Sequence, residues 1–102
     1  MWFCVSTLSV AERSGSDQQE PIWEEQLFLV NAEDQNEARS KAEVFGKREH
    51  CTYKVQGGST VTWKFHSTGK IYELPVQELA DGAEVFSRFL KGSEVRSLAQ
   101  PM

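Results

Sequence analysis

The chain has 102 residues, of which 39% are hydrophobic and 25% are charged, and its net charge is −4. These values are typical of one soluble globular domain, and they exclude the long disordered, collagen-like and coiled-coil classes. The acidic balance argues against binding of nucleic acid through its phosphates, and no segment approaches the ~20 apolar residues of a membrane span.

Two strands are predicted at the start of the chain. Residues 2–11 are rich in β-branched and aromatic side chains and predict the first strand. Residues 12–21 are polar, contain Gly and Pro, and predict a loop, after which residues 22–31 predict the second strand. The second strand is polar on both faces around Trp23 and apolar on both faces in its second half. This pattern indicates that one end is exposed and the other is covered.

A helix is predicted for residues 34–46. Asp34 and Glu37 have the spacing of a capping box, in which the Asp carboxylate accepts hydrogen bonds from the first turn and Glu37 reaches back. Gly46 is predicted to stop the helix in the left-handed conformation. The helix face that we expect to meet a sheet is narrow and formed mostly by small residues. At helical spacing it holds Ala38, Lys41, Ala42 and Phe45.

A hairpin is predicted next, because residues 50–56 and 60–66 alternate between apolar and polar side chains around two glycines. The two apolar rows are both odd-numbered, so they share a face only if paired residue numbers sum to an even value. A two-residue loop gives an odd sum, and we therefore predict a three-residue loop at 57–59 or a bulge close by. The expected pairs are Val55 with Val61 and Tyr53 with Trp63.

The last third of the chain is predicted to complete the sheet. Residues 68–69 mark a turn or a bulge, and residues 70–76 are a further strand or a continuation, which Pro75 limits to an edge or an end. Residues 83–91 contain many β-formers and favour a last strand, although their apolar residues also have helical spacing. Residues 93–102 are expected to form a C-terminal tail.

The predicted architecture is α+β, with one domain over residues 1–92. A single antiparallel sheet of about five strands carries one helix packed on one face, in the order β-β-α-β-β-β. Residues 2–11 carry no charge. They fit either an edge strand that pairs with a second copy in a two-fold homodimer or a central strand flanked by the second and last strands.

The hairpin aromatics are predicted to form the core under the helix. Tyr53, Trp63 and Phe65 alternate with lysines, a combination that resembles a stacking platform for single-stranded nucleic acid. The lysines fall on the opposite face of the hairpin. We therefore interpret the aromatics as core residues that pack on the small face of the helix, and we expect no nucleic-acid partner.

The two cysteines, Cys4 and Cys51, are far apart in the sequence and form no disulfide framework. We predict two free, buried thiols in a reducing compartment. No basic segment opens the chain as it would in a signal peptide, so we expect a cytoplasmic protein. Cysteines and histidines at zinc-ligand spacing are absent, and we expect no cofactor and no metal.

Charge is distributed unevenly along the chain. Residues 1–34 hold seven acidic residues and one basic residue, whereas residues 35–70 hold seven basic and three acidic residues. This asymmetry predicts either neighbouring elements that neutralise each other or a polar patch that recognises a charged partner.

Several short stretches occur along the chain: Trp2; Trp23-Glu24-Glu25; Ala32-Glu33-Asp34 with Glu37-Ala38 and Lys41-Ala42; Val61, Trp63 and Phe65; Asp81-Gly82, Glu84-Val85 and Ser87-Arg88. In order and spacing they resemble a small bacterial family described only as a domain of unknown function, number 4288. The resemblance spans residues 2 to about 90 and implies a single bacterial domain. It brings no established activity, and the C-terminal tail runs past the usual end of that family.

The candidate interaction residues are Trp23, Glu24, Glu25, His50, His66 and Arg88. Glu24 and Glu25 are adjacent on a strand, so they point to opposite faces, and one of them is expected to pair with Arg88 across strands. His50 and His66 face each other in the predicted register. Two histidines alone make an incomplete metal site, so we interpret them as half-exposed strand residues.

No complete catalytic constellation occurs in the sequence. We therefore expect a non-catalytic binding or accessory module that acts through protein–protein contact. The alternative is a small ligand-binding protein or enzyme with a pocket between the sheet and the 12–21 loop. A deep pocket with convergent polar residues favours the alternative, and a flat exposed patch favours the module.

Overall fold

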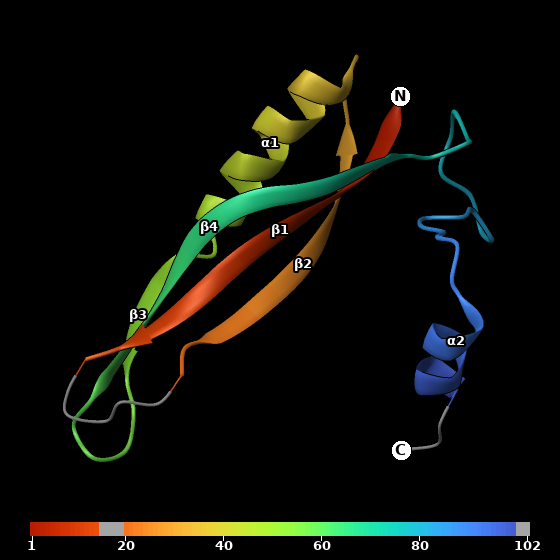
Figure 1. The fold of residues 1–102 in the computed structure, drawn as a ribbon. Coiled ribbons are helices and arrows are strands. Elements are labelled where there is room, and N and C mark those ends of the chain that lie inside the picture. The colour runs from red at the N-terminus through yellow and green to blue at the C-terminus, as the bar shows by residue number, and fades with distance from the viewer. Residues whose placement is uncertain (15–19, 100–102) are drawn as a thin grey trace.

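A computed structural model describes residues 1–14 and 20–99, in which four antiparallel strands form one sheet and helix α1 covers one face of it (Figure 1). The elements are β1 (Trp2–Arg13), β2 (Ile22–Asn31), α1 (Gln35–Lys47), β3 (Cys51–Lys54), β4 (Thr60–Glu73) and α2 (Gly92–Ala99). The protein is therefore α+β with a single antiparallel sheet, as predicted, but the sheet has four strands in place of five.

Strand β1 is central, because the strand order is β2-β1-β4-β3. On one side Phe3 lies opposite Val30, and on the other side it lies opposite Glu73. A strand that is paired on both sides needs no charge to block an edge. The uncharged residues 2–11 therefore lie in a central strand, β1, whose neighbours are β2 and β4. The position that β4 occupies is the one that the sequence predicted for residues 83–91, as the last strand.

Of the two predictions for residues 68–69, a turn or a bulge, the structure has the bulge, so that β4 continues from Thr60 to Glu73. The register between β1 and β4 shifts beside Ser6, whose Oγ accepts a hydrogen bond from the backbone N–H of Lys70 at 2.9 Å. A Cβ at Gly69 would overlap that hydroxyl. The missing side chain therefore lets the bulge form, and bulges bend and twist a sheet.

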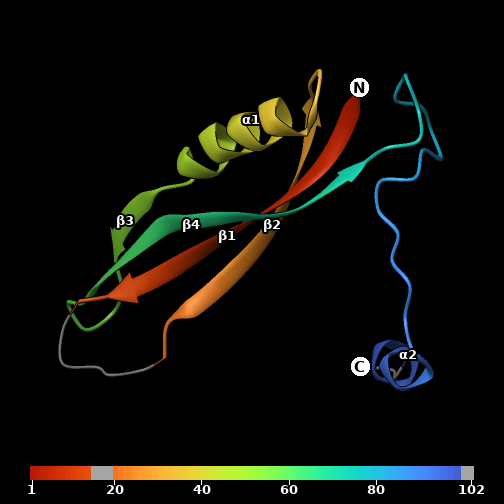
Figure 2. The same cartoon turned by 45° about the horizontal axis from the view of Figure 1, so that its top comes forward.

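Residues 75–91 have no regular structure and lead to α2 at a distance from the sheet (Figure 2). The strand predicted for residues 83–91 is wrong, and the predicted tail begins with α2, while residues 100–102 lie outside the described part. Strand propensity reflects packing on a pleated, half-buried surface, and here no strand pairs with the segment. The radius of gyration, 17.2 Å, exceeds the ~13 Å of a compact chain of this length.

Helix α1 begins as predicted. The Asp34 carboxylate accepts a hydrogen bond from the backbone N–H of Glu37 at 2.8 Å, which caps the first turn. The Glu37 carboxylate does not reach back, because it pairs with Lys41 at 3.2 Å. Ala38 and Ala42 are fully buried, as expected for a helix that lies close to a sheet.

Gly46 does not stop the helix, which continues to Lys47, and its φ is not positive. Gly46 instead allows α1 and β4 to pack closely, because a Cβ at this position would lie 2.7 Å from Cδ2 of Phe65 on β4. The absence of a side chain lets the last turn of α1 rest on this ring.

The core lies between α1 and the start of β1. Phe3 and Val5 of β1 pack with Val30 of β2 and with the two helix alanines, and Phe45 adds to this cluster. The cluster predicted from the sequence is therefore partly wrong. Phe65 touches α1 at Gly46, but Tyr53 and Trp63 are not part of the core cluster, and β3 does not contact α1.

The β3–β4 hairpin has the predicted parity and a three-residue loop, but its register is shifted by two residues. Tyr53 lies opposite Val61, and the N–H of Val55 donates to the Ser59 carbonyl at 2.9 Å. The loop is therefore 56–58, in place of the predicted 57–59. Gly57 and Gly58 both have positive φ, which glycine adopts without the penalty that a Cβ brings.

Candidate functional sites

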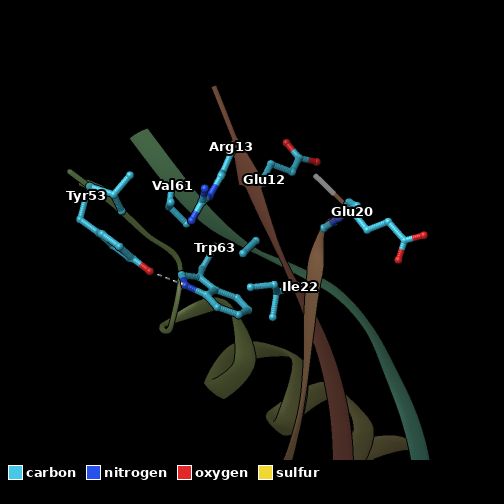
Figure 3. A pocket seen from close by; sticks show the side chains of 10 residues that line it. Glu12, Arg13, Glu20, Ile22, Tyr53, Val61 and Trp63 are labelled. Atoms are coloured by element: carbon cyan, nitrogen blue, oxygen red, sulfur yellow. Dashed lines mark hydrogen bonds between the residues drawn. The ribbon is translucent and has the colours of Figure 1, made fainter. Parts of the chain in front are cut away.

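A cleft of about 380 Å³ opens on the α1 side of the sheet, past the end of the helix (Figure 3). The end of β1, the start of β2 and the β3–β4 hairpin surround it, whereas residues 15–19 of the loop in the alternative prediction lie outside the described part of the chain. Its lining is mainly apolar and consists of Ala11, Pro21, Ile22, Tyr53, Val55, Val61 and Trp63, with Glu12, Arg13 and Glu20 as the charged members.

Trp63 is held in this cleft by a hydrogen bond from its indole Nε1 to the Tyr53 hydroxyl at 3.2 Å, and the Ile22 side chain lies next to the indole (Figure 3). The described lining residues include no Ser, Cys or His. The cleft therefore offers an aromatic and aliphatic surface to a small apolar group, and its described lining lacks a serine or cysteine nucleophile and an imidazole base.

The second candidate site is the open face, which is the face of the sheet opposite α1. The alternation and the pairing of β1, β2 and β4 place on it the apolar and aromatic residues Cys4, Leu8, Val10, Trp23, Leu27, Leu29 and Tyr72, together with polar residues that include Ser6, Glu12, Glu25, Lys64, His66 and Ser67. On β2 the side chains of Trp23, Leu27 and Leu29 are 51%, 56% and 43% exposed. Neighbouring exposed apolar residues of this size mark interaction sites on soluble proteins.

Polar groups interrupt the open face, among them the Lys64–Glu12 ion pair at 2.9 Å. The Trp23 and His66 rings meet edge to face, with centroids 4.9 Å apart. Glu25 lies between Trp23 and Leu27 along β2, opposite Leu8, and no ion pair involves it within residues 1–14 and 20–99. The β2 row of the open face is therefore apolar apart from one unneutralised carboxylate.

Three of the predicted interaction residues, Trp23, Glu25 and His66, thus share one surface. Glu24 lies opposite Ser9 and points to the other face, which confirms that the two glutamates cannot act as a pair. Arg88 forms no ion pair with Glu24 or Glu25 in the described part of the chain, so the predicted cross-strand pair is wrong within one protomer. The reason is that residues 83–91 form no strand beside β2.

The predicted facing of His50 and His66 is also wrong. Cys51 pairs with Trp63, so the shifted register carries His50 past β3 toward Lys64, and it lies beside Lys47 and Phe65. No cluster of three or more His, Cys, Asp or Glu residues that could hold a metal ion occurs among the residues described.

Sequence reasoning missed Leu27 and Leu29, because the second half of β2 was expected to be covered on both faces. Only the face with Val30, which is 1% exposed, lies under α1. The signal was present in the sequence: β2 is apolar on both faces there, whereas one helix can cover only one face of a sheet.

Both cysteines are free, as predicted, but they differ in exposure. Cys4 is buried on the open face, and this burial raises the pKa of its thiol. Cys51 is exposed on β3, which corrects the prediction of two buried thiols. A raised pKa reduces the thiolate fraction at neutral pH, so Cys4 is a packing residue and a poor nucleophile.

Taken together, these features define a small α+β domain with one helix, an apolar cleft and an uncovered sheet face. The chain belongs to the family described as Domain of unknown function (DUF4288), whose sequence profile matches residues 2–87. That match includes the sheet and α1 and ends before α2. No curated protein and no solved structure matches the chain. Neither helix in the described part is long and apolar enough to cross a membrane.

Proposed function

We propose that the protein is a non-catalytic binding module that acts through protein–protein contact at its open face. The observation that carries the proposal is the exposure of Trp23, Leu27 and Leu29 beside the half-buried Leu8 and Val10. Burying such residues against a partner removes apolar surface from water at about 25 cal/mol per Å². Tryptophan is also among the residues that contribute most to binding at protein interfaces.

The test is site-specific photo-crosslinking in the cells that make the protein. A benzophenone amino acid at Leu27 is expected to give discrete protein adducts, because its ring would lie inside the interface. The matched control carries the same group at Ser40, which is exposed on α1. Adducts at Leu27 that are no stronger than those at Ser40 contradict the proposal, and mass spectrometry of the adducts distinguishes a second copy from another protein.

The second candidate function is binding of a small apolar ligand in the cleft. It is favoured by the half-buried Trp63 and its exposed partner Tyr53, and by a volume of about 380 Å³, which lies near the lower end of the ~300–1,000 Å³ of ligand pockets. This candidate is independent of the first, because the cleft and the open face lie on opposite sides of the sheet.

Anilinonaphthalene sulfonate is a suitable fluorescent probe for the cleft. Trp63→Ala is expected to raise the Kd of the probe about tenfold, because an aromatic contact contributes roughly 0.5–1.5 kcal/mol. The control Leu27→Ser changes the open face alone and is expected to leave this Kd unchanged. The reverse pattern, loss with Leu27→Ser only, places the probe on the open face and removes the cleft as a candidate.

A further inference from the structure

We propose that the open face is covered by the C-terminal arm of a second copy of this chain, so that two protomers exchange arms in a two-fold dimer. The arm is defined as residues 84–96, from the segment after the sheet to the body of α2. The inference rests on the proposed function and names the partner that contacts the open face.

The arm is rich in apolar residues and lies apart from its own domain. Phe89 is 105% exposed, and Val85 and Val95 are about half exposed. Helix α2 contacts neither α1 nor any strand within the part of the chain described. The exposed large apolar side chains of the arm are Val85, Phe86, Phe89, Leu90 and Val95. Such a segment gains stability when it finds an apolar surface to cover.

The arm starts at the open face itself. The Phe86 ring meets Tyr72 edge to face, with centroids 6.1 Å apart, and the Ser87 hydroxyl donates to the Tyr72 hydroxyl at 3.3 Å. Tyr72 lies opposite Cys4 on the open face. Beyond these contacts the arm runs on at a distance from the strands (Figures 1 and 2). Its remaining residues are therefore placed to meet a second protomer that approaches the open face.

Charged groups of opposite sign lie next to the apolar residues of the arm and of the open face, although the arm as a whole holds three basic and two acidic residues. Arg88 and Lys91 flank Phe89 and Leu90 in the arm, and Glu25 interrupts the apolar row of β2. No ion pair in the described residues involves any of these three charged groups. An apolar arm with basic residues thus complements an apolar face with a carboxylate, and such complementarity selects one partner and one orientation.

A second copy is the occupant because it supplies both halves of the interface. A different protein would need one apolar segment to cover the open face and a second apolar surface to bind the arm. In a two-fold dimer each protomer contributes one face and one arm, so a single closed interface covers all four surfaces. This interface does not use the edge of β1, which is paired on both sides within the protomer.

The mass of the purified full-length protein tests the inference. Light scattering over roughly 1–200 µM, a range that covers weak interfaces, is expected to show a rise from 11.6 kDa to twice that mass. Phe89→Ser is expected to weaken association about tenfold or more, and it cannot unfold the domain because Phe89 touches nothing within it. The control Val44→Ser removes an exposed apolar residue from α1, away from the arm and the open face, and is expected to have no effect.

Charge reversal tests whether the contact is between protomers. Glu25→Arg and Arg88→Glu are each expected to weaken the homodimer, since both of its sites then hold like charges. An equimolar mixture of the two variants is expected to associate as the wild type does. In the mixed dimer each site again holds one positive and one negative charge, because one site carries the reversed pair and the other carries the native pair. Glu24→Arg, on the opposite face, is the matched control.

Specific results overturn the inference. A mass of 11.6 kDa at every concentration excludes the second copy. A dimer that Phe89→Ser leaves unchanged excludes the arm from the interface. If Glu25→Arg and Arg88→Glu each leave the dimer unchanged, or if their mixture does not associate as the wild type does, Arg88 does not pair with Glu25 of the second protomer. If the protein is monomeric while Leu27 still crosslinks to a different protein, the proposed function stands and this inference fails. If Leu27 gives no adduct either, both fail.

Discussion

Phe3→Ala is expected to lower the free energy of unfolding by about 3–5 kcal/mol. Phe3 is 1% exposed and is among the largest fully buried side chains, in the cluster with Val5, Val30 and the two helix alanines. Truncation removes the transfer energy of the ring and leaves a cavity beneath α1 that the paired strands β2 and β4 cannot close. A domain of this size has a total stability of roughly 5–15 kcal/mol, so the loss is a large part of it.

Urea denaturation followed by circular dichroism measures this effect, at a protein concentration low enough to keep the chain monomeric. Trp63→Ala is the comparison, because Trp63 is larger but only half-buried in an open cleft. Its loss is expected to be about 1–2 kcal/mol, in line with the smaller apolar area that it buries. If Trp63→Ala costs more than Phe3→Ala, the main core lies at the hairpin end of the sheet, as the sequence first indicated.

Gly46→Leu is expected to lower the free energy of unfolding by about 3 kcal/mol, near the upper end for overpacking. Even a Cβ at this position would lie 2.7 Å and 2.9 Å from two carbons of the Phe65 ring and 3.6 Å from Cγ2 of Thr7. A longer side chain must therefore push the last turn of α1 away from β4. This cost exceeds the roughly 1 kcal/mol that a helix interior gains when glycine is replaced.

The matched experiment combines Gly46→Leu with Phe65→Ala. The second substitution removes the ring that the leucine meets, so the double variant is expected to lose less stability than the sum of the two single variants. Chemical denaturation of all four proteins gives the coupling energy directly. Strict additivity would falsify the close approach of α1 to Phe65 as the reason for Gly46.

The two candidate surfaces lie on opposite sides of one sheet, so their roles can be separated by substitution. The cleft depends on Trp63 and its partner Tyr53, and the open face depends on Leu27, Leu29 and Glu25. A cellular effect that follows substitutions on one side only therefore assigns the function to that side.

The sequence by itself determined the elements whose causes are local. The start of α1 follows from Asp34, which binds an N–H three residues away, and its buried face follows from the spacing of Ala38 and Ala42. The strand at 22–31 follows from its local composition, and the parity of the hairpin follows from alternation over a few residues. Such features do not depend on residues far away in the sequence, because a helix cap and the alternation of side chains involve only residues within a few positions of each other.

Only the tertiary structure decided which strands are neighbours and which residues are exposed. β1 is central because Phe3 pairs with both Val30 and Glu73, residues far away in the sequence. The same pairing leaves no place for residues 83–91 as a strand, although their composition favours one. Leu27 is exposed while Val30 is buried because a single helix covers a single face. Propensity and alternation define two faces for each strand, and the packing of distant elements decides which face is covered.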